Sequence, residues 1–274
     1  MAAIAFPDID PVLLTLGPLE LRWYGVSYVA GFLVAVLIAR SLNRRWKVGL
    51  TDDDLLDILL AAVVALVVGA RIGYVLFYGA GAYWDDPLSV FALWDGGMSF
   101  HGGLAGLLLV GAWLARRKGV PMLRLFDLGA VGSPLGILFG RTANFINGEL
   151  WGRVTDVPWG IVFPAAPGTA PRHPSQLYEA LLEGLVLFLV LFALSRRKRP
   201  DGFMIGTLLL LYAAFRIFIE FFREPDVQLG FIAGPFTMGQ LLTLPMLIAG
   251  AVLLVRAVRS GKRAGEPSED IDPL

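Results

Sequence analysis

The 274-residue chain contains no cysteine, only two histidines, and a charged fraction of 17%. Without cysteine, no disulfide holds the fold together, and no thiolate of the chain acts as a nucleophile or metal ligand. Two histidines alone also disfavour a dedicated transition-metal site, so we expect neither a metal nor a cofactor. A soluble protein of this length needs more charge to cover its surface, so the composition excludes an ordinary soluble domain.

Other sequence patterns are absent as well. The chain has no Walker-type phosphate loop, no Gly-x-Ser-x-Gly nucleophile turn and no His-Glu-x-x-His zinc motif. Its N-terminus lacks a basic region followed by an apolar core, so we expect no cleaved signal peptide. The first 20 residues hold three prolines, and we predict an irregular, half-apolar arm there.

Hydrophobic residues make up 56% of the chain, and its mean hydropathy is +0.67. We therefore predict an all-α membrane protein with a single integral membrane domain over residues 1–260. Seven apolar stretches each approach the roughly 20 residues that a helix needs to cross a bilayer. The predicted transmembrane helices are 21–39, 55–78, 99–115, 126–146, 175–194, 202–222 and 238–258. Thr51 and the three aspartates after it suit the N-terminus of the second helix.

The basic residues indicate the orientation of this bundle. Sixteen of the 23 lysines and arginines lie in four groups, which follow predicted helices one, three, five and seven. Because such groups stay on the cytoplasmic side, we predict an outside N-terminus and a cytoplasmic C-terminus. The longest external connection, about 148–174, is predicted to form a small extracytoplasmic cap. Residues 261–274 are predicted to form a polar, disordered cytoplasmic tail.

Several polar residues are predicted to lie at a similar depth in the membrane. With a helical rise of ~1.5 Å per residue, Arg216, Arg141 and Arg71 lie ~21, ~22 and ~24 Å from the cytoplasmic ends of their helices. His101 and Tyr24 follow the outer starts of their own helices. Charges in hydrocarbon are tolerated for a pairing or a substrate. We therefore expect one polar layer near the outer third of the bilayer.

The polar layer is richest in residues 140–153, which follow an apolar run. Arg141 and Asn144 are three residues apart, so they share a helical face. The glycines at 148 and 152 predict that the helix ends and the backbone turns tightly. A guanidinium fork beside amide groups is suited to holding a phosphate. The polar residues of this stretch are Arg141, Asn144, Asn147, Glu149 and Arg153.

Predicted helix six carries a polar stripe, because Tyr212, Arg216 and Glu220 are spaced four apart and Arg223 follows three later. The structural alternatives for the buried arginines are ion pairs. Arg216 pairs with Glu220 in one of them, and Arg141 with Glu149 in another. For Arg71, we favour a structural ion pair over a role in the site.

The histidines and the remaining glutamates each have two interpretations. His101 is either a proton acceptor or an interfacial histidine bound to a loop, and the residues alone favour neither. His173 is predicted to face water. Glu149 and Glu220 are predicted to orient the arginines. Glu179 and Glu183, four apart in predicted helix five, face either the same pocket or the outer interface.

Six segments give the chain a family resemblance. They are RWYG at 22–25, GARIGY at 69–74, SFHGG at 99–103, GRTANFINGELWGR at 140–153, RHPSQLYE at 172–179 and FRIFIEFFREPD at 215–226. With these segments the chain resembles the prolipoprotein diacylglyceryl transferases of bacteria. The 140–153 block is the most specific of them.

The resemblance implies transfer of a diacylglyceryl group from phosphatidylglycerol to the lipobox cysteine thiol of a prolipoprotein, at the outer face of the bacterial inner membrane. A thioether forms and glycerol phosphate leaves. The implied catalytic residues are His101 as base and Arg141 and Arg216 as phosphate ligands. The predicted substrate-binding residues are Tyr24, Asn144, Asn147, Glu149, Gly152, Tyr212, Glu220 and Arg223. We expect membrane lipids and the signal peptide as partners, and no nucleic acid.

Two other classes of protein also fit buried arginines. A transporter or flippase for an anionic lipid or substrate uses charged residues within the membrane, but the chain has no convincing internal repeat and its polar layer is one-sided. A non-catalytic lipid-binding scaffold does not require His101. Product formation on a cysteine peptide separates the three.

Overall fold

The computed structural model describes residues 4–7, 9–17, 19–79, 83, 86–92, 96–225, 231–233 and 236–261. The chain divides into two compact units. The larger unit comprises residues 1–46 and 127–274, and the smaller unit comprises residues 47–126. Nearly all of the predicted tail, 262–274, lies outside the described residues, as do Trp84 and Asp226.

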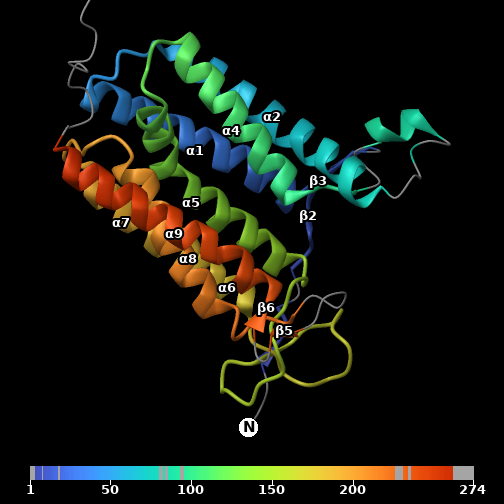
Figure 1. Cartoon of the computed structure of the whole chain (residues 1–274). Helices are drawn as coiled ribbons and strands as arrows, with labels where there is room; N and C mark the ends of the chain where they lie inside the picture. Colours follow the sequence, from blue (N-terminus) through green and yellow to red (C-terminus); the bar gives the residue numbers. More distant parts are fainter. Residues whose placement is uncertain are drawn as a thin grey trace, which may run out of the picture. The chain divides into compact units, whose positions relative to one another are not determined.

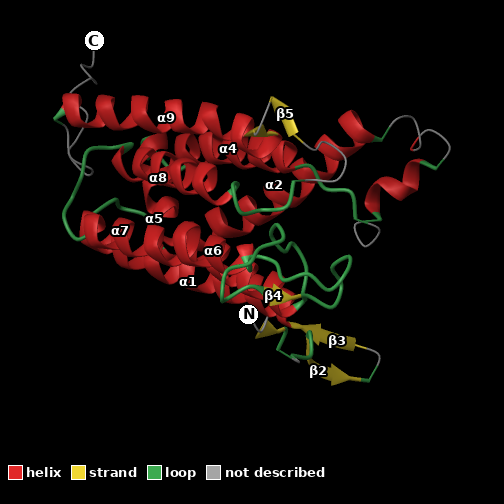
Figure 2. Cartoon of the chain, turned by 90° about the horizontal axis from the view of Figure 1, so that it is seen from below, coloured by secondary structure: helices red, strands yellow, loops and turns green. Residues whose placement is uncertain are grey.

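The N-terminal arm of the larger unit was predicted to be irregular, but in the structure it contains three short strands. β2 (Val12–Leu16) and β3 (Leu19–Arg22) form an antiparallel hairpin, while β1 (Ile4–Ala5) pairs in parallel with β4 (Ile161–Val162). Figure 2 shows these strands at one end of the helices. Alternating leucines and a Gly17 with a φ of 61° allow the hairpin, a pattern that the prolines had obscured.

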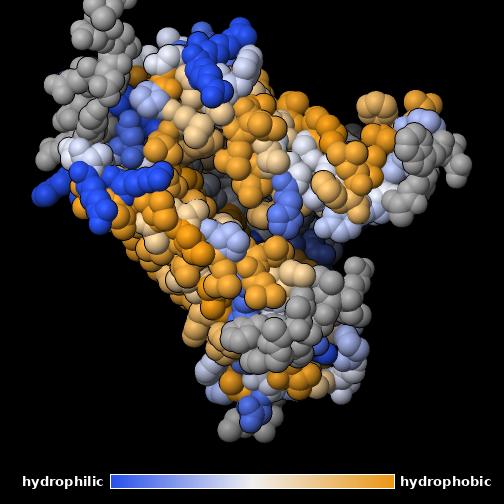
Figure 3. Space-filling model, viewed as in Figure 1, coloured by the Kyte–Doolittle hydropathy of each residue, from blue (hydrophilic) through white to orange (hydrophobic). Residues whose placement is uncertain are grey.

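The larger unit is built from long apolar helices (Figure 1). They are α1 (Trp23–Trp46), α5 (Met122–Ile146, which belongs to this unit from Asp127 on), α8 (Phe203–Ile219) and α9 (Met238–Ser260), together with a continuous helical segment at 175–195. That segment consists of α6 (Ser175–Glu179), the π-helical turn η3 (Ala180–Val186) and α7 (Leu187–Ser195). Figure 3 shows hydrophobic side chains on the exposed flank of α9, as expected for a surface that faces lipid.

The smaller unit contains α2 (Asp52–Tyr78), the 3₁₀ turn η1 (Pro87–Phe91) and α4 (Phe100–Arg117). Thr51 caps α2 by accepting a hydrogen bond from the Asp54 backbone, which confirms the predicted helix start. The α2 and α4 backbones approach closely, because a Cβ on Gly73 would lie 2.7 Å from the Gly102 Cα. Glycine permits this packing, as the glycine spacing of both segments indicates.

Helices occupy all seven predicted positions within the described residues. Five of them are long and apolar enough to cross a membrane: α1, α2, α5, the 175–195 segment and α9. α8 is a shorter apolar helix, and it ends at Ile219 instead of the predicted 222. α1 begins at Trp23, because Arg22 belongs to β3. The chain is therefore a mostly helical, multi-pass membrane protein.

Candidate functional site

Arg141 and Arg216 meet at one carboxylate in the larger unit. Arg141 stands near the end of α5 and Arg216 near the end of α8. The Arg141 Nε atom lies 2.5 Å from Glu179 Oε2, and Arg216 Nη1 lies 3.2 Å from Glu179 Oε1. Two arginines that were predicted to lie at a similar depth on separate helices therefore meet at one carboxylate.

Three more charged residues complete this arrangement. Arg223 Nη1 lies 2.9 Å from Glu179 Oε1, so one carboxylate contacts three guanidinium groups. Arg216 also lies 3.2 Å from Glu220 Oε2, the ion pair named as its structural alternative, and 3.8 Å from Glu183 Oε1. We call these six residues the arginine–glutamate cluster: Arg141, Arg216, Arg223, Glu179, Glu183 and Glu220.

Burial makes the cluster electrostatically demanding. The Glu179 side chain is 1% exposed, whereas Arg141 is 23% exposed and is the most accessible guanidinium of the three. With every member ionised, three positive charges balance three negative ones. A buried charge without a partner is costly, so balance is the condition under which these groups remain in the membrane.

Glu179 and Glu183 reach the cluster through the helical segment at 175–195. Glu179 ends α6, and Glu183 lies on the π-helical turn that follows. Two side chains of the first turn of α6 bind the loop that follows α5: Ser175 Oγ donates to the Leu150 carbonyl, and Gln176 Nε2 donates to the Glu149 carbonyl. Because both Glu179 and Glu183 contact Arg216, the alternative in which the two glutamates face the same site is the correct one.

The loop after α5 organises its own amides. Asn144 Nδ2 and Asn147 Nδ2 both donate to Glu149 Oε1, at 2.9 and 3.1 Å. Arg141 pairs with Glu179, so the Arg141–Glu149 ion pair, which was one structural alternative, is not the arrangement found. The backbone turns at Gly148, where φ is 66° and glycine is favoured, so the Glu149 carboxylate folds back onto α5.

Gly152 is enclosed by protein. It forms a bridge with Arg223, and its amide donates to the His173 carbonyl. A Cβ here would overlap the Phe222 carbonyl oxygen and lie 2.8 Å from His173 Cβ. This close approach connects the 148–174 segment, the predicted cap, to the segment after α8 that contains Arg223.

Replacing Gly152 with alanine should destabilise the protein, because the backbone on both sides must move. We expect a loss of about 1–3 kcal/mol in the free energy of unfolding, from overpacking. Thermal unfolding in detergent measures it, with Gly140→Ala as the control, because nothing lies within 4 Å of a Cβ at Gly140. Equal stability of the two variants would contradict the packing described above.

Arg172 and His173 belong to the same joint. Arg172 is buried and donates to the Gly152 carbonyl and to Glu224 Oε2. His173 is half-buried and its Nδ1 lies 3.1 Å from the Tyr178 hydroxyl, so the prediction that it simply faces water is wrong. Burial lowers the pKa of His173, which keeps the imidazole neutral near pH 7.

The remaining predicted residues of the larger unit surround the cluster to different degrees. Arg153 donates to the carbonyls of Arg223 and Glu220. Tyr212 is half-buried on α8, one turn before Arg216. The Tyr24 hydroxyl, on the first turn of α1, lies 3.0 Å from the Tyr28 hydroxyl, and its ring is partly exposed.

Arg71 and His101 lie in the smaller unit. Arg71 donates to the backbone carbonyls of Ser89, Val90, Gly96 and Gly97. These contacts agree with the structural role that we favoured for Arg71. Its partners are carbonyl oxygens, however, and not the carboxylate of an ion pair. His101 is exposed on the first turn of α4, and Ser99 caps that helix. Its role as a base stays a prediction.

Sequence reasoning missed the importance of Glu179 and of Asp127. The four-residue spacing of Glu179 and Glu183 was visible, but their arginine partners lie 33 or more residues away along the chain. Asp127 is 1% exposed and accepts hydrogen bonds from two amides at the start of α8. A carboxylate in an apolar segment was the available signal.

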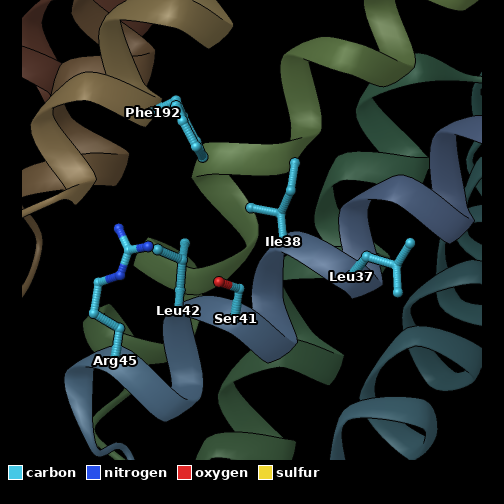
Figure 4. Close-up of a pocket in the computed structure, with 6 residues that line it drawn as sticks. All are labelled: Leu37, Ile38, Ser41, Leu42, Arg45 and Phe192. Atoms are coloured by element: carbon cyan, nitrogen blue, oxygen red, sulfur yellow. The ribbon is translucent and has the colours of Figure 1, made fainter.

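A shallow groove lies near the other end of the larger unit. It has a volume of about 220 Å³ and is lined by α1 residues from Leu37 to Arg45 and by Phe192 of α7, as Figure 4 shows. Phe192 is 13 residues from Glu179 along one helical segment, hence ~20 Å away. The groove is therefore separate from the cluster.

Comparisons with known proteins show which sequences this chain is similar to. The family model described as prolipoprotein diacylglyceryl transferase matches residues 11–256. A phosphatidylglycerol–prolipoprotein diacylglyceryl transferase of Geobacter sulfurreducens is 52% identical over 254 residues, covering 93% of this chain and 97% of that protein. The protein of the same name from Oleidesulfovibrio alaskensis is 49% identical over 271 residues, covering 97% of this chain and 100% of its own.

Proposed function

This chain belongs to the prolipoprotein diacylglyceryl transferase family, and we propose that it transfers the diacylglyceryl group of phosphatidylglycerol to the lipobox cysteine of a prolipoprotein. This is the first step of lipoprotein maturation. The observation that carries the site assignment is the meeting of Arg141, Arg216 and Arg223 around the buried Glu179.

The cluster suits a phosphate that becomes a leaving group. Within the described part of the chain, Arg141 contacts Glu179 through Nε, so its two terminal nitrogens are available to a ligand. A phosphodiester takes up these donors in bidentate fashion. Because Glu179 and Glu183 hold Arg216 in place, the site is organised before the lipid arrives, as electrostatic catalysis requires.

The reaction is a displacement at carbon. The cysteine sulfur bonds to the glyceryl carbon that carries the phosphate, and the carbon–oxygen bond breaks. The bridging oxygen leaves with the electron pair, as glycerol phosphate. Arg141 and Arg216 stabilise the charge that grows on this oxygen, while Asn144, Asn147 and Glu149 shape the loop beside them.

The membrane setting follows the same proposal. The lipid's acyl chains lie in the bilayer, so the reacting phosphate lies at headgroup depth, where we place the cluster. We propose seven transmembrane helices in the bacterial inner membrane, an outside N-terminus and a cytoplasmic C-terminus. The cap formed by about 148–174 then lies on the outer face, where an exported precursor arrives.

A labelling experiment tests the function. Purified protein is incubated with phosphatidylglycerol and a lipobox peptide, and the peptide is examined by mass spectrometry. We expect a mass gain of one diacylglyceryl group on cysteine, and an identical peptide with serine in place of cysteine serves as the control. Absence of the adduct, with lipid bound or moved across vesicles instead, would favour a scaffold or a transporter.

His101 is proposed as the base for the thiol, whose ordinary pKa is ~8.5. We expect His101→Asn to lose most of the transfer activity at pH 7, about 100-fold for a general base. Raising the pH to 9 should restore much of it, because the thiol then ionises unaided. Initial rates across pH 6–9 measure the effect. Full activity at pH 7 would show that His101 is not the base.

A further inference from the structure

Asp127 joins the starts of the two helices that carry the phosphate-binding arginines. It lies on the second turn of α5, and its side chain is almost fully buried. Its Oδ2 accepts a hydrogen bond of 2.7 Å from the Gly202 amide, and its Oδ1 accepts one of 2.8 Å from the Ile205 amide. Both oxygens of the carboxylate are thus used on α8.

The start of α8 depends on this carboxylate. Gly202 occupies the position before the helix with a φ of 88°, and it has no side chain to cap the first amides. Helix N-termini leave amides without intrahelical partners and favour negative charge. An N-cap side chain ordinarily accepts hydrogen bonds from the first amides of its own helix. Here the Asp127 carboxylate, which belongs to α5, accepts those hydrogen bonds for α8.

The distance from this joint to the cluster is the same along both helices. Asp127 and Arg141 are 14 residues apart on α5, and Gly202 and Arg216 are also 14 residues apart. Both separations correspond to ~21 Å of helix. α5 and α8 run in the same direction (Figure 1), so equal lengths place both guanidinium groups at one level.

The contacts of Glu179 show that Arg141 and Arg216 lie at the same level along the two helices. Although Pro134 lies within α5, the Arg141 and Arg216 guanidinium groups both contact the Glu179 carboxylate. Sliding α8 by one residue would move Arg216 by ~1.5 Å, which is enough to break a contact of this kind.

We propose that Asp127 is a positioning residue: by joining α5 to α8 it sets their axial register, and so the spacing of Arg141 and Arg216 on the lipid phosphate. The inference rests on the proposed function for its catalytic part, but the register itself is a property of the fold. Asp127 touches no substrate, and it acts through the two arginines about 20 Å away.

The chain's lack of cysteine allows a direct test of register. Cysteines placed at Thr142 on α5 and at Phe218 on α8, both exposed, are the only sites for spin labels. In Asp127→Asn an NH₂ group replaces one acceptor oxygen, so two hydrogen-bond donors face each other and one of the two hydrogen bonds to α8 is lost. We expect the interspin distance measured by EPR to shift or broaden by ~1.5 Å or more, and kcat/KM to fall about 10- to 100-fold.

Two further variants make the result specific. Gly202→Ala disturbs the same joint from its other side, so the double variant should lose little more than either single variant. Asp57→Asn, an exposed carboxylate paired with Lys118 in the smaller unit, is the matched control and should stay within about twofold of wild type.

The outcomes separate the two proposals. Loss of activity with an unchanged interspin distance, or a changed distance with full activity, overturns the role of Asp127. Unchanged activity and distance overturn it as well, and so do additive effects of the two joint variants. A wild-type protein that transfers no lipid overturns the proposed function, while the EPR distances still decide whether Asp127 sets the register.

Discussion

Replacing Arg216 with alanine is expected to reduce transfer about 1,000-fold, because the change removes a preorganised cation from the leaving phosphate. Arg216 contacts three carboxylates, so its loss also removes a counter-charge from each of them. Arg216→Lys keeps the charge but not the planar fork, and it should remain at least about 10-fold impaired. Initial rates of peptide labelling by membrane preparations measure both variants.

Controls distinguish lost chemistry from lost protein. Both variants should be recovered from the membrane fraction at wild-type amounts. Arg22→Ala is the matched control, because Arg22 is 63% exposed and pairs only with Glu20 on the β3 strand among the described residues. We expect it to stay within about twofold of wild type. Near-normal labelling by Arg216→Ala would refute the role given to this residue.

Glu179→Gln is the second change with a large expected effect. The carboxylate is 1% exposed and contacts three arginines, so the amide leaves three partly buried positive charges with two negative ones. Removing one partner of a buried ion pair costs about 3–5 kcal/mol. The arginines then separate by repulsion, and we expect transfer to fall about 100-fold because the phosphate ligands are displaced.

Stability and activity are both measured for Glu179→Gln. Thermal unfolding in detergent should show a lower transition, and adding phosphatidylglycerol should recover part of it, because the lipid phosphate supplies a negative charge to the arginines. Glu224→Gln is the control, since Glu224 is 45% exposed and contacts Arg172 alone among the described residues. A Glu179→Gln protein with wild-type stability and rate would exclude Glu179 as the centre of the cluster.

Much of the fold was predictable because the membrane imposes a strong local rule. A stretch of about 20 apolar residues forms a helix whatever its neighbours are, since every backbone group must be paired inside the segment. Within the described residues, helices therefore occupy every position that hydropathy predicted, and Thr51 was found as a cap from its own residues. The β2–β3 hairpin was missed, because pairing between strands of this length depends on a turn at Gly17 and not on composition.

One part of the candidate site was also predictable from the sequence, and another part was not. Arg141 and Arg216 were placed at one depth by counting residues along each helix, and the structure brings them to one carboxylate. The identity of that carboxylate was not predictable. Glu149 is near Arg141 along the chain but folds back onto Asn144, whereas Glu179 comes from a different helix.

The order of apolar and polar residues was enough to predict that this protein is helical and apolar, where its helices lie, and which of them carry arginines. These properties follow from the cost of unpaired backbone and charge in hydrocarbon, which acts on each segment separately. The packing of the helices, by contrast, brings three arginines to Glu179 and places the Asp127 carboxylate against the start of α8. Such choices depend on which helices pack together and how each is rotated, and many pairings of buried charges satisfy the same local rule.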